Sequence, residues 1–206
     1  ADTDRSVEFI NSHNPKKAVV VGAGYIGLEM AENLQGGGIS VEIVEMLNQV
    51  MPLLDKEMAD YLHRQLKKHG VTVRLGESVC SFEQDESSLK IKLNSGKELS
   101  CDFAILSTGV KPEVKLAGQT GLETGELGGI KVDEYLQTSD PDIYAGGDCV
   151  VNHYVDPISR LPLFTPLGST SNKHGRTIAD DIAVRPHPFA GVTGTGVCRA
   201  FDFTLG

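Results

Sequence analysis

No two cysteines lie close together in this sequence. Successive cysteines are 21, 48 and 49 positions apart, and the four residues are Cys80, Cys101, Cys149 and Cys198. Zinc sites and local redox disulfides use cysteines only a few positions apart, so we expect no metal site and no local redox disulfide. The four thiols are expected to be reduced and mostly buried.

Long apolar runs and an excess of positive charge are also absent. No run approaches the ~20 apolar residues of a membrane span, and the first residues lack the basic and apolar regions of a signal peptide. The formal net charge of −9 and the pI near 5.1 argue against nucleic acid or an anionic membrane as a partner. We therefore expect a cytoplasmic protein, and its 40% hydrophobic content is enough for a core.

A glycine-rich turn follows the first apolar run. The segment VVVGAGYIGLE at residues 19–29 is typical of a buried strand, a turn and the start of a helix. Gly22, Gly24 and Gly27 have the G-x-G-x-x-G spacing of a dinucleotide-binding βαβ unit. In such a unit Gly22 allows the tight turn, Gly24 lets a pyrophosphate approach the backbone, and Gly27 lets the helix pack close to the strand. The positive helix end then faces the phosphates.

An acidic residue completes this unit. A second strand is predicted over residues 40–45 and ends at Glu45, which lies 21 positions beyond Gly24, near the expected ~20. A carboxylate here accepts hydrogen bonds from ribose hydroxyls and repels a 2′-phosphate. Residues 46–48 offer no arginine or lysine to hold that phosphate. The sequence therefore predicts NAD as a cofactor, with NADH favoured over NADPH.

The remaining pattern predicts an α/β fold: a Rossmann-like parallel sheet with an antiparallel β-meander. Three short segments at 79–83, 89–93 and 98–102 are separated by turns instead of helices. Helical spacing predicts one buried face made of Ile26, Met30 and Leu34. Further elements are expected as a strand at 71–75, a buried strand at 103–107, a short strand at 128–132, helices at 55–69 and 169–183, and one strand in the last residues.

Three motifs together resemble the pyridine nucleotide–disulfide oxidoreductases, which are flavoproteins with two dinucleotide sites. They are VVGAGYIGLE at 20–29, STGVKP at 107–112 and TSDPDIYAGGD at 138–148. The segments MPLLD at 51–55 and NKHGR at 172–176 favour the branch of NADH oxidases and coenzyme A–disulfide reductases. The resemblance implies an oxidoreductase that transfers hydride from NADH to FAD. The terminal acceptor stays open among disulfide, oxygen, peroxide and ferredoxin-type acceptors.

The resemblance also implies a domain organisation. It assigns residues 1–14 to a lead-in segment, 15–115 to an NAD-binding domain, 116–188 to the returning part of an FAD-binding domain, and 189–206 to the start of a truncated C-terminal interface domain. The family's first glycine fingerprint and its redox cysteine are not found in this sequence. We therefore expect a fragment of a larger, homodimeric flavoenzyme. Alone, it should bind NADH, retain FAD poorly and not turn over.

Site residues follow from the same resemblance. Tyr25 resembles the tyrosine that covers the flavin until nicotinamide displaces it, and Glu29 resembles the acid beside the nicotinamide, so both are candidate catalytic residues. The residues expected to hold NAD are Gly22, Gly24, Gly27 and Glu45. The residues expected around FAD are Gly147, Asp148, Leu167 and Gly168, and Tyr25, Ile26 and Gly109 are expected to bind a cofactor as well.

Two other functions fit part of the sequence. A non-catalytic, regulatory NAD-binding module would account for the glycine turn but not for the motif that ends at Asp148. A single-cofactor dehydrogenase would need a catalytic lysine, tyrosine or histidine. His153 and His174 lie in no recognisable arrangement, and we expect each to be a surface or helix-face residue.

Overall fold

The computed structural model describes residues 2–85, 88–155 and 161–205. The chain divides into two compact units. Unit 1 consists of Ala1–Gly109 and Val197–Gly206, and unit 2 consists of Val110–Gly196. Within the described ranges, no helix is long and apolar enough to cross a bilayer.

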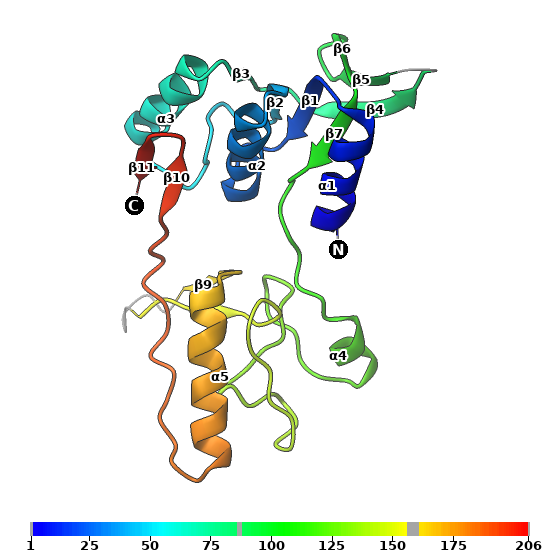
Figure 1. Cartoon of the computed structure of the whole chain (residues 1–206). Helices are drawn as coiled ribbons and strands as arrows, with labels where there is room; N and C mark the ends of the chain where they lie inside the picture. The colour runs from blue at the N-terminus through cyan, green and yellow to red at the C-terminus, as the bar shows by residue number, and fades with distance from the viewer. Residues whose placement is uncertain (1, 86–87, 156–160, 206) are drawn as a thin grey trace. The chain divides into compact units, whose positions relative to one another are not determined.

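A parallel sheet of four strands forms the centre of unit 1 (Figure 1). Its order is β3-β2-β1-β7, with bounds Thr72–Leu75, Ser40–Glu45, Lys17–Val21 and Phe103–Leu106. Successive side chains of a strand point to opposite faces. Accordingly, Val19 and Val21 of β1 join one hydrophobic cluster, and Ala18 and Val20 join the other. The parallel sheet predicted from the sequence is confirmed.

Helices cover one face of this sheet. They are α1 (Asp2–His13), α2 (Tyr25–Gly36) and α3 (Lys56–Lys68). On α2 the buried stripe consists of Gly27, Leu28, Ala31 and Leu34. The prediction that Ile26 belongs to the buried face is wrong, since its side chain is 53% exposed. Close packing of Gly27 against the glycine turn sets the rotation of the helix and leaves Ile26 outside.

The predicted meander covers the other face. It consists of β4 (Val79–Gln84), β5 (Leu89–Leu93) and β6 (Glu98–Cys101), paired antiparallel in that order. Ile91 and Leu99 pack against Val19 and Val44 of the parallel sheet. Residues 86–87, in the turn between β4 and β5, lie outside the described residues. Unit 1 therefore has three layers: helices, parallel sheet and meander.

The last residues form a hairpin, which corrects the prediction of a single strand. Its strands are β10 (Cys198–Ala200) and β11 (Phe203–Leu205). The chain reverses at Phe201, whose φ is +56°, and this ring stacks on His69 at the end of α3 with 4.2 Å between ring centroids. The hairpin therefore belongs to the hydrophobic core of unit 1.

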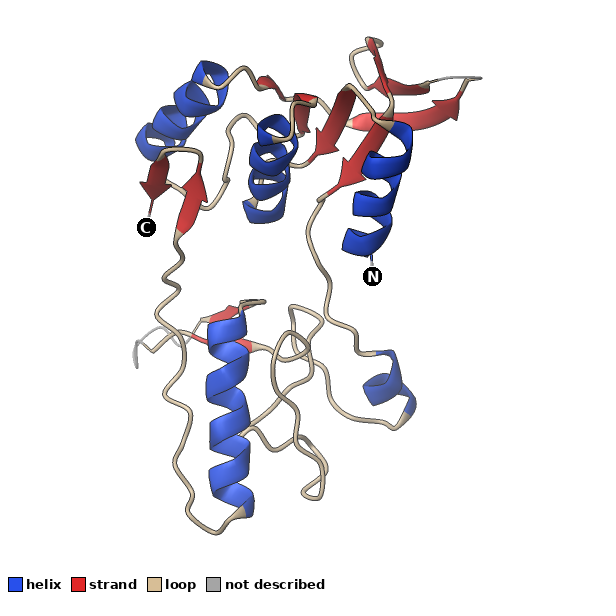
Figure 2. Cartoon of the chain, viewed as in Figure 1, coloured by secondary structure: helices blue, strands red, loops and turns tan. Residues whose placement is uncertain are grey.

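Unit 2 contains little regular structure (Figure 2). Its elements are α4 (Lys115–Gln119), β8 (Asn152–His153), β9 (Pro162–Leu163) and α5 (Gly168–Ile182). The helix predicted at 169–183 is confirmed as α5. The strand predicted at 128–132 is wrong, because only Ile130 makes isolated bridges there. A small core forms where Ile130 packs with Ala117 and Val150.

All four cysteines are free thiols, as predicted. The expectation that most are buried is wrong, because Cys101 and Cys198 are buried while Cys149 is half-buried and Cys80 is exposed. Cys80 lies on β4, in the layer that faces solvent on one side. Alternation along that strand therefore decides its exposure.

A row of charges crosses three strands of the parallel sheet. Glu42 of β2 is only 6% exposed. Its carboxylate accepts a hydrogen bond from Arg74 Nε of β3 and lies 3.6 Å from Lys17 Nζ of β1. The two cations compensate the buried carboxylate, since a buried charge needs partners.

Glu42→Gln should lower the free energy of unfolding by about 2 kcal/mol. A hydrogen bond to a charged group contributes about 1.5–3 kcal/mol, and the change leaves both cations without their partner. Glu83→Gln is the matched control, because Glu83 also pairs across strands, with Lys92 at 2.8 Å, but is exposed. Urea unfolding followed by circular dichroism measures both. Equal losses in the two variants would contradict a special role for the buried carboxylate.

Candidate functional site

The turn between β1 and α2 is held by close backbone contacts. Gly22 has a φ of +102°, and its N–H donates to Val44 O at 2.8 Å. A Cβ at Gly22 would lie 2.4 Å from Ser107 O, at the end of β7. Ser107 Oγ in turn donates to Val21 O at 2.9 Å and lies 3.1 Å from Gly22 O. The turn therefore joins the carboxyl ends of β1, β2 and β7.

The three fingerprint glycines serve different needs. A Cβ at Gly27 would lie 2.0 Å from Gly22 O, so both of these glycines are required by the packing of the chain itself. Gly24 is different. Its φ is −81°, which any residue adopts, and a Cβ there would meet no atom within 4 Å. The open space at Gly24 fits a ligand that approaches the backbone.

Glu45 lies at the end of β2, beside this turn. Its side chain is 7% exposed. Oε2 accepts the Ala23 N–H at 2.7 Å, and Oε1 accepts the Leu47 N–H at 2.8 Å. A carboxylate has about four lone-pair sites, so further acceptor capacity remains after these two bonds. Glu45 therefore fixes the turn and retains acceptor capacity beside it.

The N-terminus of α2 is suited to an anion. Its N-cap, Gly24, makes no side-chain capping bond, and the first helical bond runs from Leu28 N–H to Gly24 O. The N–H groups of the first helical turn are therefore left for a ligand, and the helix dipole favours negative charge there.

The structure brings the predicted NAD residues together at one edge of the sheet. Besides the glycines and Glu45, this edge contains the first turn of α2. Tyr25 begins the helix and is half-buried against the core, Ile26 is exposed, and Glu29 is exposed one turn later. The two residues after Glu45 are also exposed, Met46 by 68% and Leu47 by 43%.

Unit 2 contains a second loop of interest, at residues 146–148. Gly147 has a φ of +84°, and its N–H donates to His174 Nδ1 at 2.9 Å. Of the two alternatives predicted for His174, a surface or a helix-face position, the structure has the second: it lies on a face of α5 with its side chain fully buried. Two consecutive glycines, Gly146 and Gly147, were the sequence signal for such close packing against a helix. His153 is exposed, as predicted.

Most of the predicted flavin residues cluster around the start of α5. Asp148 is exposed, and its Oδ1 lies 3.2 Å from Ser171 Oγ. The same hydroxyl lies 3.2 Å from Leu167 O, and Leu167 is the N-cap of α5. Gly168 is the first residue of that helix and is exposed. Gly109, exposed with a φ of +99°, lies at the end of the first segment of unit 1.

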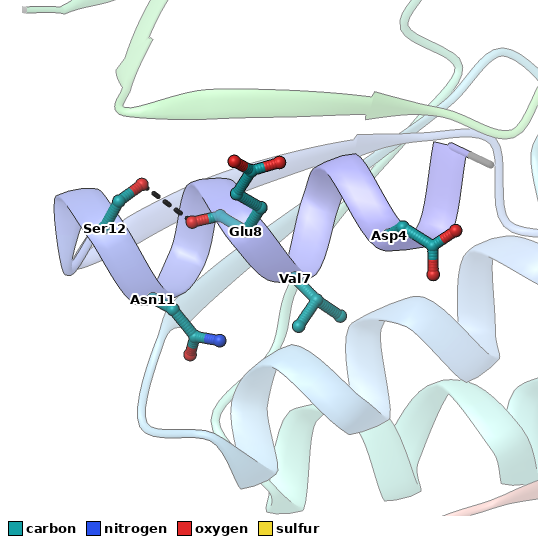
Figure 3. Close-up of a pocket in the computed structure, with 5 residues that line it drawn as sticks. All are labelled: Asp4, Val7, Glu8, Asn11 and Ser12. Atoms are coloured by element: carbon teal, nitrogen blue, oxygen red, sulfur yellow. Dashed lines mark hydrogen bonds between the residues drawn. The ribbon is translucent and has the colours of Figure 1, made fainter.

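A shallow hollow on α1 is separate from these loops (Figure 3). It is lined by Asp4, Val7, Glu8, Asn11 and Ser12. None of the residues of α1 is buried, and Ser12 Oγ donates to Glu8 O at 2.7 Å within the helix. The hollow shares no residue with the glycine turn.

The fold and the glycine turn define a dinucleotide-binding α/β protein. A family model described as pyridine nucleotide-disulphide oxidoreductase matches residues 2–169. The chain belongs to this family, whose members are oxidoreductases.

Relatives with known names agree with this assignment. The NAD(P)H coenzyme A polysulfide/persulfide reductase of Pyrococcus horikoshii is 36% identical over 97% of this chain and 44% of its own length. The structure of reduced CoADR-RHD from Bacillus anthracis has a TM-score of 0.93 at 41% identity, and the match covers 98% of this chain and 36% of that chain. The chain therefore spans less than half the length of these relatives.

Two further structures concern nicotinamide choice. The water-forming NADH oxidase from Lactobacillus brevis, bound to NADH, has a TM-score of 0.90 at 28% identity, covering 98% of this chain and 44% of that chain. Its engineered form, a water-forming NADPH oxidase bound to NADPH, has a TM-score of 0.88 at 28% identity, with the same coverage. The predicted similarity to NADH oxidases and coenzyme A–disulfide reductases is confirmed.

Gly22→Ala should lower the free energy of unfolding by about 3 kcal/mol, because left-handed backbone costs alanine about 1–2 kcal/mol and overpacking costs about 1–3 kcal/mol. Gly24→Ala is the matched control. It should unfold like the wild type but bind NADH about tenfold more weakly, because its methyl would occupy the open space at the turn. Urea unfolding and NADH fluorescence titration separate the two effects. Unchanged NADH affinity in Gly24→Ala would contradict a ligand at this turn.

Proposed function

We propose that this chain is the NAD(H)-binding portion of a flavoprotein oxidoreductase that transfers hydride from NADH to FAD and on to a disulfide, oxygen or related acceptor. The observation that carries the proposal is the open space at Gly24 beside the uncapped start of α2. Both features suit a pyrophosphate, and Glu45 is placed to accept hydrogen bonds from ribose. Family membership supports the flavin-dependent step, because a related structure from Desulfovibrio vulgaris, 36% identical to this chain, is described as an FAD-dependent pyridine nucleotide-disulphide oxidoreductase.

Residue roles follow this assignment. Tyr25 would cover the flavin ring, and Glu29 would lie beside the nicotinamide. On the flavin side, the exposed Asp148 carboxylate would accept hydrogen bonds from hydroxyl groups of FAD, and the positive end of α5 at Gly168 would stabilise negative charge. FAD, when bound, supplies the hydride acceptor.

The domain boundaries belong to the proposal as well. We assign residues 15–115 to the NAD domain, 116–188 to part of the FAD domain and 189–206 to the start of an interface domain, after a lead-in segment at 1–14. The division of the chain between Gly109 and Val110 supports a boundary between the NAD domain and the FAD domain near residue 115. We further propose a cytoplasmic protein that forms a homodimer as part of the whole enzyme and binds neither nucleic acid nor membrane, as its net charge of −9 favours.

Preference for NADH over NADPH is supported by a shared spacing. The engineered NADPH oxidase carries substitutions at a glycine, at an aspartate 18 positions later and at a proline 25 positions after the glycine, and an arginine replaces the residue after the aspartate. In this chain Gly27 is followed by Glu45 after the same 18 positions and by Pro52 after the same 25. Met46 then corresponds to the arginine. This shared spacing supports the proposal that Glu45 and Met46 take part in the choice between the two cofactors.

Met46→Arg should raise NADPH affinity about tenfold and leave NADH affinity close to that of the wild type. The exposed guanidinium would pair with the 2′-phosphate, and a charge-assisted hydrogen bond contributes about 1.5–3 kcal/mol. Met46 is a cleaner position than Glu45, because Glu45→Arg would also remove the bonds to Ala23 and Leu47. Fluorescence titration with each cofactor is the measurement.

Met46→Gln is the control for side-chain length without charge, and its NADPH affinity should stay low. The proposal predicts that the wild type binds NADH at least about tenfold more tightly than NADPH, since Glu45 repels the 2′-phosphate. Equal affinity of the wild type for both cofactors would contradict the selectivity. If neither NADH nor NADPH binds, the proposed NAD site at the glycine turn is contradicted.

FAD should be retained weakly by the 206-residue chain. The chain spans 44% of the length of a relative such as the Pyrococcus reductase, and the flavin residues proposed here are a few exposed groups around the start of α5. The purified chain should therefore be nearly colourless and gain flavin absorbance only with excess FAD. Stoichiometric flavin absorbance after gel filtration would show this expectation to be wrong.

A further inference from the structure

The turn at residues 146–148 lies directly on one face of α5. Ser171, His174 and Ile178 are spaced three and four positions apart, which places them on the same face of the helix. A Cβ at Gly146 would lie 3.0 Å from His174 Cβ and 3.1 Å from Ile178 Cδ1. The backbone of the turn and the helix therefore meet without an intervening side chain on the turn.

One polar bond fixes this contact. His174 Nδ1 accepts the Gly147 N–H at 2.9 Å, so the proton of the neutral ring is on Nε2. His174 is fully buried, and among the described residues its Nε2 has no hydrogen-bond partner. Phe189 packs edge-on against the ring, with 4.5 Å between centroids. Only a neutral imidazole makes this bond, because both nitrogens of the imidazolium are donors.

We propose that His174 is a positioning residue for flavin binding: its neutral Nδ1 holds Gly147 on α5 and so presents the Asp148 carboxylate to the hydroxyl groups of FAD. This inference rests on the proposed function, in which Asp148 binds the flavin. Protonation of His174 sets two N–H donors against each other, so the turn leaves α5 and the carboxylate loses its fixed position. The Ser171 hydroxyl, 3.2 Å from Asp148 Oδ1, completes the support.

The direction of the pH dependence follows from the burial of the ring. Burial lowers the pKa of His174 from its ordinary value of 6.5. Above 6.5 the ring is neutral in the folded and unfolded chain, so the contact is complete. As the pH falls below 6.5, the unfolded chain takes up the proton first, and the contact is lost as the pH falls through the lowered pKa.

Charged neighbours do not reverse this direction, because burial is the cause of the lowered pKa. Tyr144 donates to Asp181 Oδ2 at 2.5 Å, and Cys149 Sγ lies 3.4 Å from Gly146 O. Titratable and charged groups on the elements in contact with His174 are Lys173, Arg176, Asp180 and Asp181 on α5, Tyr144, Asp148 and Cys149 around the glycine turn, Arg185 and His187 before Phe189, and Glu134, whose carbonyl accepts the Phe189 N–H.

The test compares the wild type with His174→Leu and His174→Asn. Leucine fills the buried space but accepts no hydrogen bond, whereas the Oδ1 of asparagine lies close to the position of Nδ1 and accepts one without titrating. The readouts are hydrogen exchange of the Gly147 amide by nuclear magnetic resonance and FAD affinity by flavin fluorescence. Both are measured on the isotope-labelled full chain at about pH 8 and at the lowest pH at which the chain stays folded, because burial lowers the pKa of the ring below its ordinary value.

The expected exchange rate at the lower pH is calculated from the rate at the higher pH and the intrinsic pH dependence of amide exchange. We expect the wild-type Gly147 amide to exchange about tenfold faster than this rate, because it has lost one hydrogen bond. His174→Leu should show the fast exchange at both pH values, and His174→Asn the slow exchange at both. FAD affinity should follow the same pattern. The titration of the wild type needs no variant, so a failure of His174→Leu to fold leaves the test intact.

Slow exchange of Gly147 in His174→Leu, or no pH effect in the wild type, would overturn the inference. So would fast exchange in a folded His174→Asn. Absence of FAD binding at both pH values would contradict the flavin part of the proposed function, and the proposal for His174 would fall with it. FAD binding that is insensitive to His174 would overturn the inference alone.

Discussion

Backbone contact at the end of β1 is the constraint on which the dinucleotide site depends. The carbonyls of Gly22 and Ser107 occupy space that a side chain at Gly27 or Gly22 would otherwise fill. Three chain segments meet there, and the Ser107 hydroxyl bonds the end of β1 within the contact. Because α2 starts at that point, its uncapped N–H groups lie at the carboxyl edge of the sheet, where a parallel α/β sheet binds its ligands.

Glu45 links this constraint to cofactor choice. Its carboxylate holds Ala23 in the turn and Leu47 beyond the strand, and it is almost fully buried. The same group is the one that would meet the ribose. On the proposed assignment, selectivity and the shape of the turn are coupled at Glu45, whereas Met46 is 68% exposed. A change of cofactor would then be easier to achieve at Met46 than at Glu45.

Most elements of unit 1 could be predicted from the sequence, because each depends on the pattern of residues close together in the chain. Alternation located β4, β5 and β6, and glycine spacing located the turn before α2. Two features could not be predicted in this way. The buried face of α2 depends on how Gly27 meets the turn. The docking of the last hairpin depends on Phe201 stacking on His69, residues far apart in the sequence.

The burial of His174 was missed for a related reason. A histidine between a lysine and a glycine on a polar helix carries no local sign of burial. It is buried by Gly146 and Gly147, about 27 positions earlier, and by Phe189, 15 positions later. In the structure, α5 occupies the space beside Gly146, because a Cβ at Gly146 would lie 3.0 Å from His174 Cβ.

The two glycine turns therefore differ in which residues are needed for packing and which are left to meet a ligand. In unit 1, Gly22 and Gly27 serve packing and Gly24 stays open. In unit 2, both glycines lie against α5, so the group left to meet a ligand is the exposed Asp148 carboxylate. Its placement then depends on a hydrogen bond made by a titratable ring, whereas the turn in unit 1 is fixed by backbone and carboxylate contacts. The proposed flavin turn is thus held by an imidazole, whose protonation removes the acceptor of its hydrogen bond.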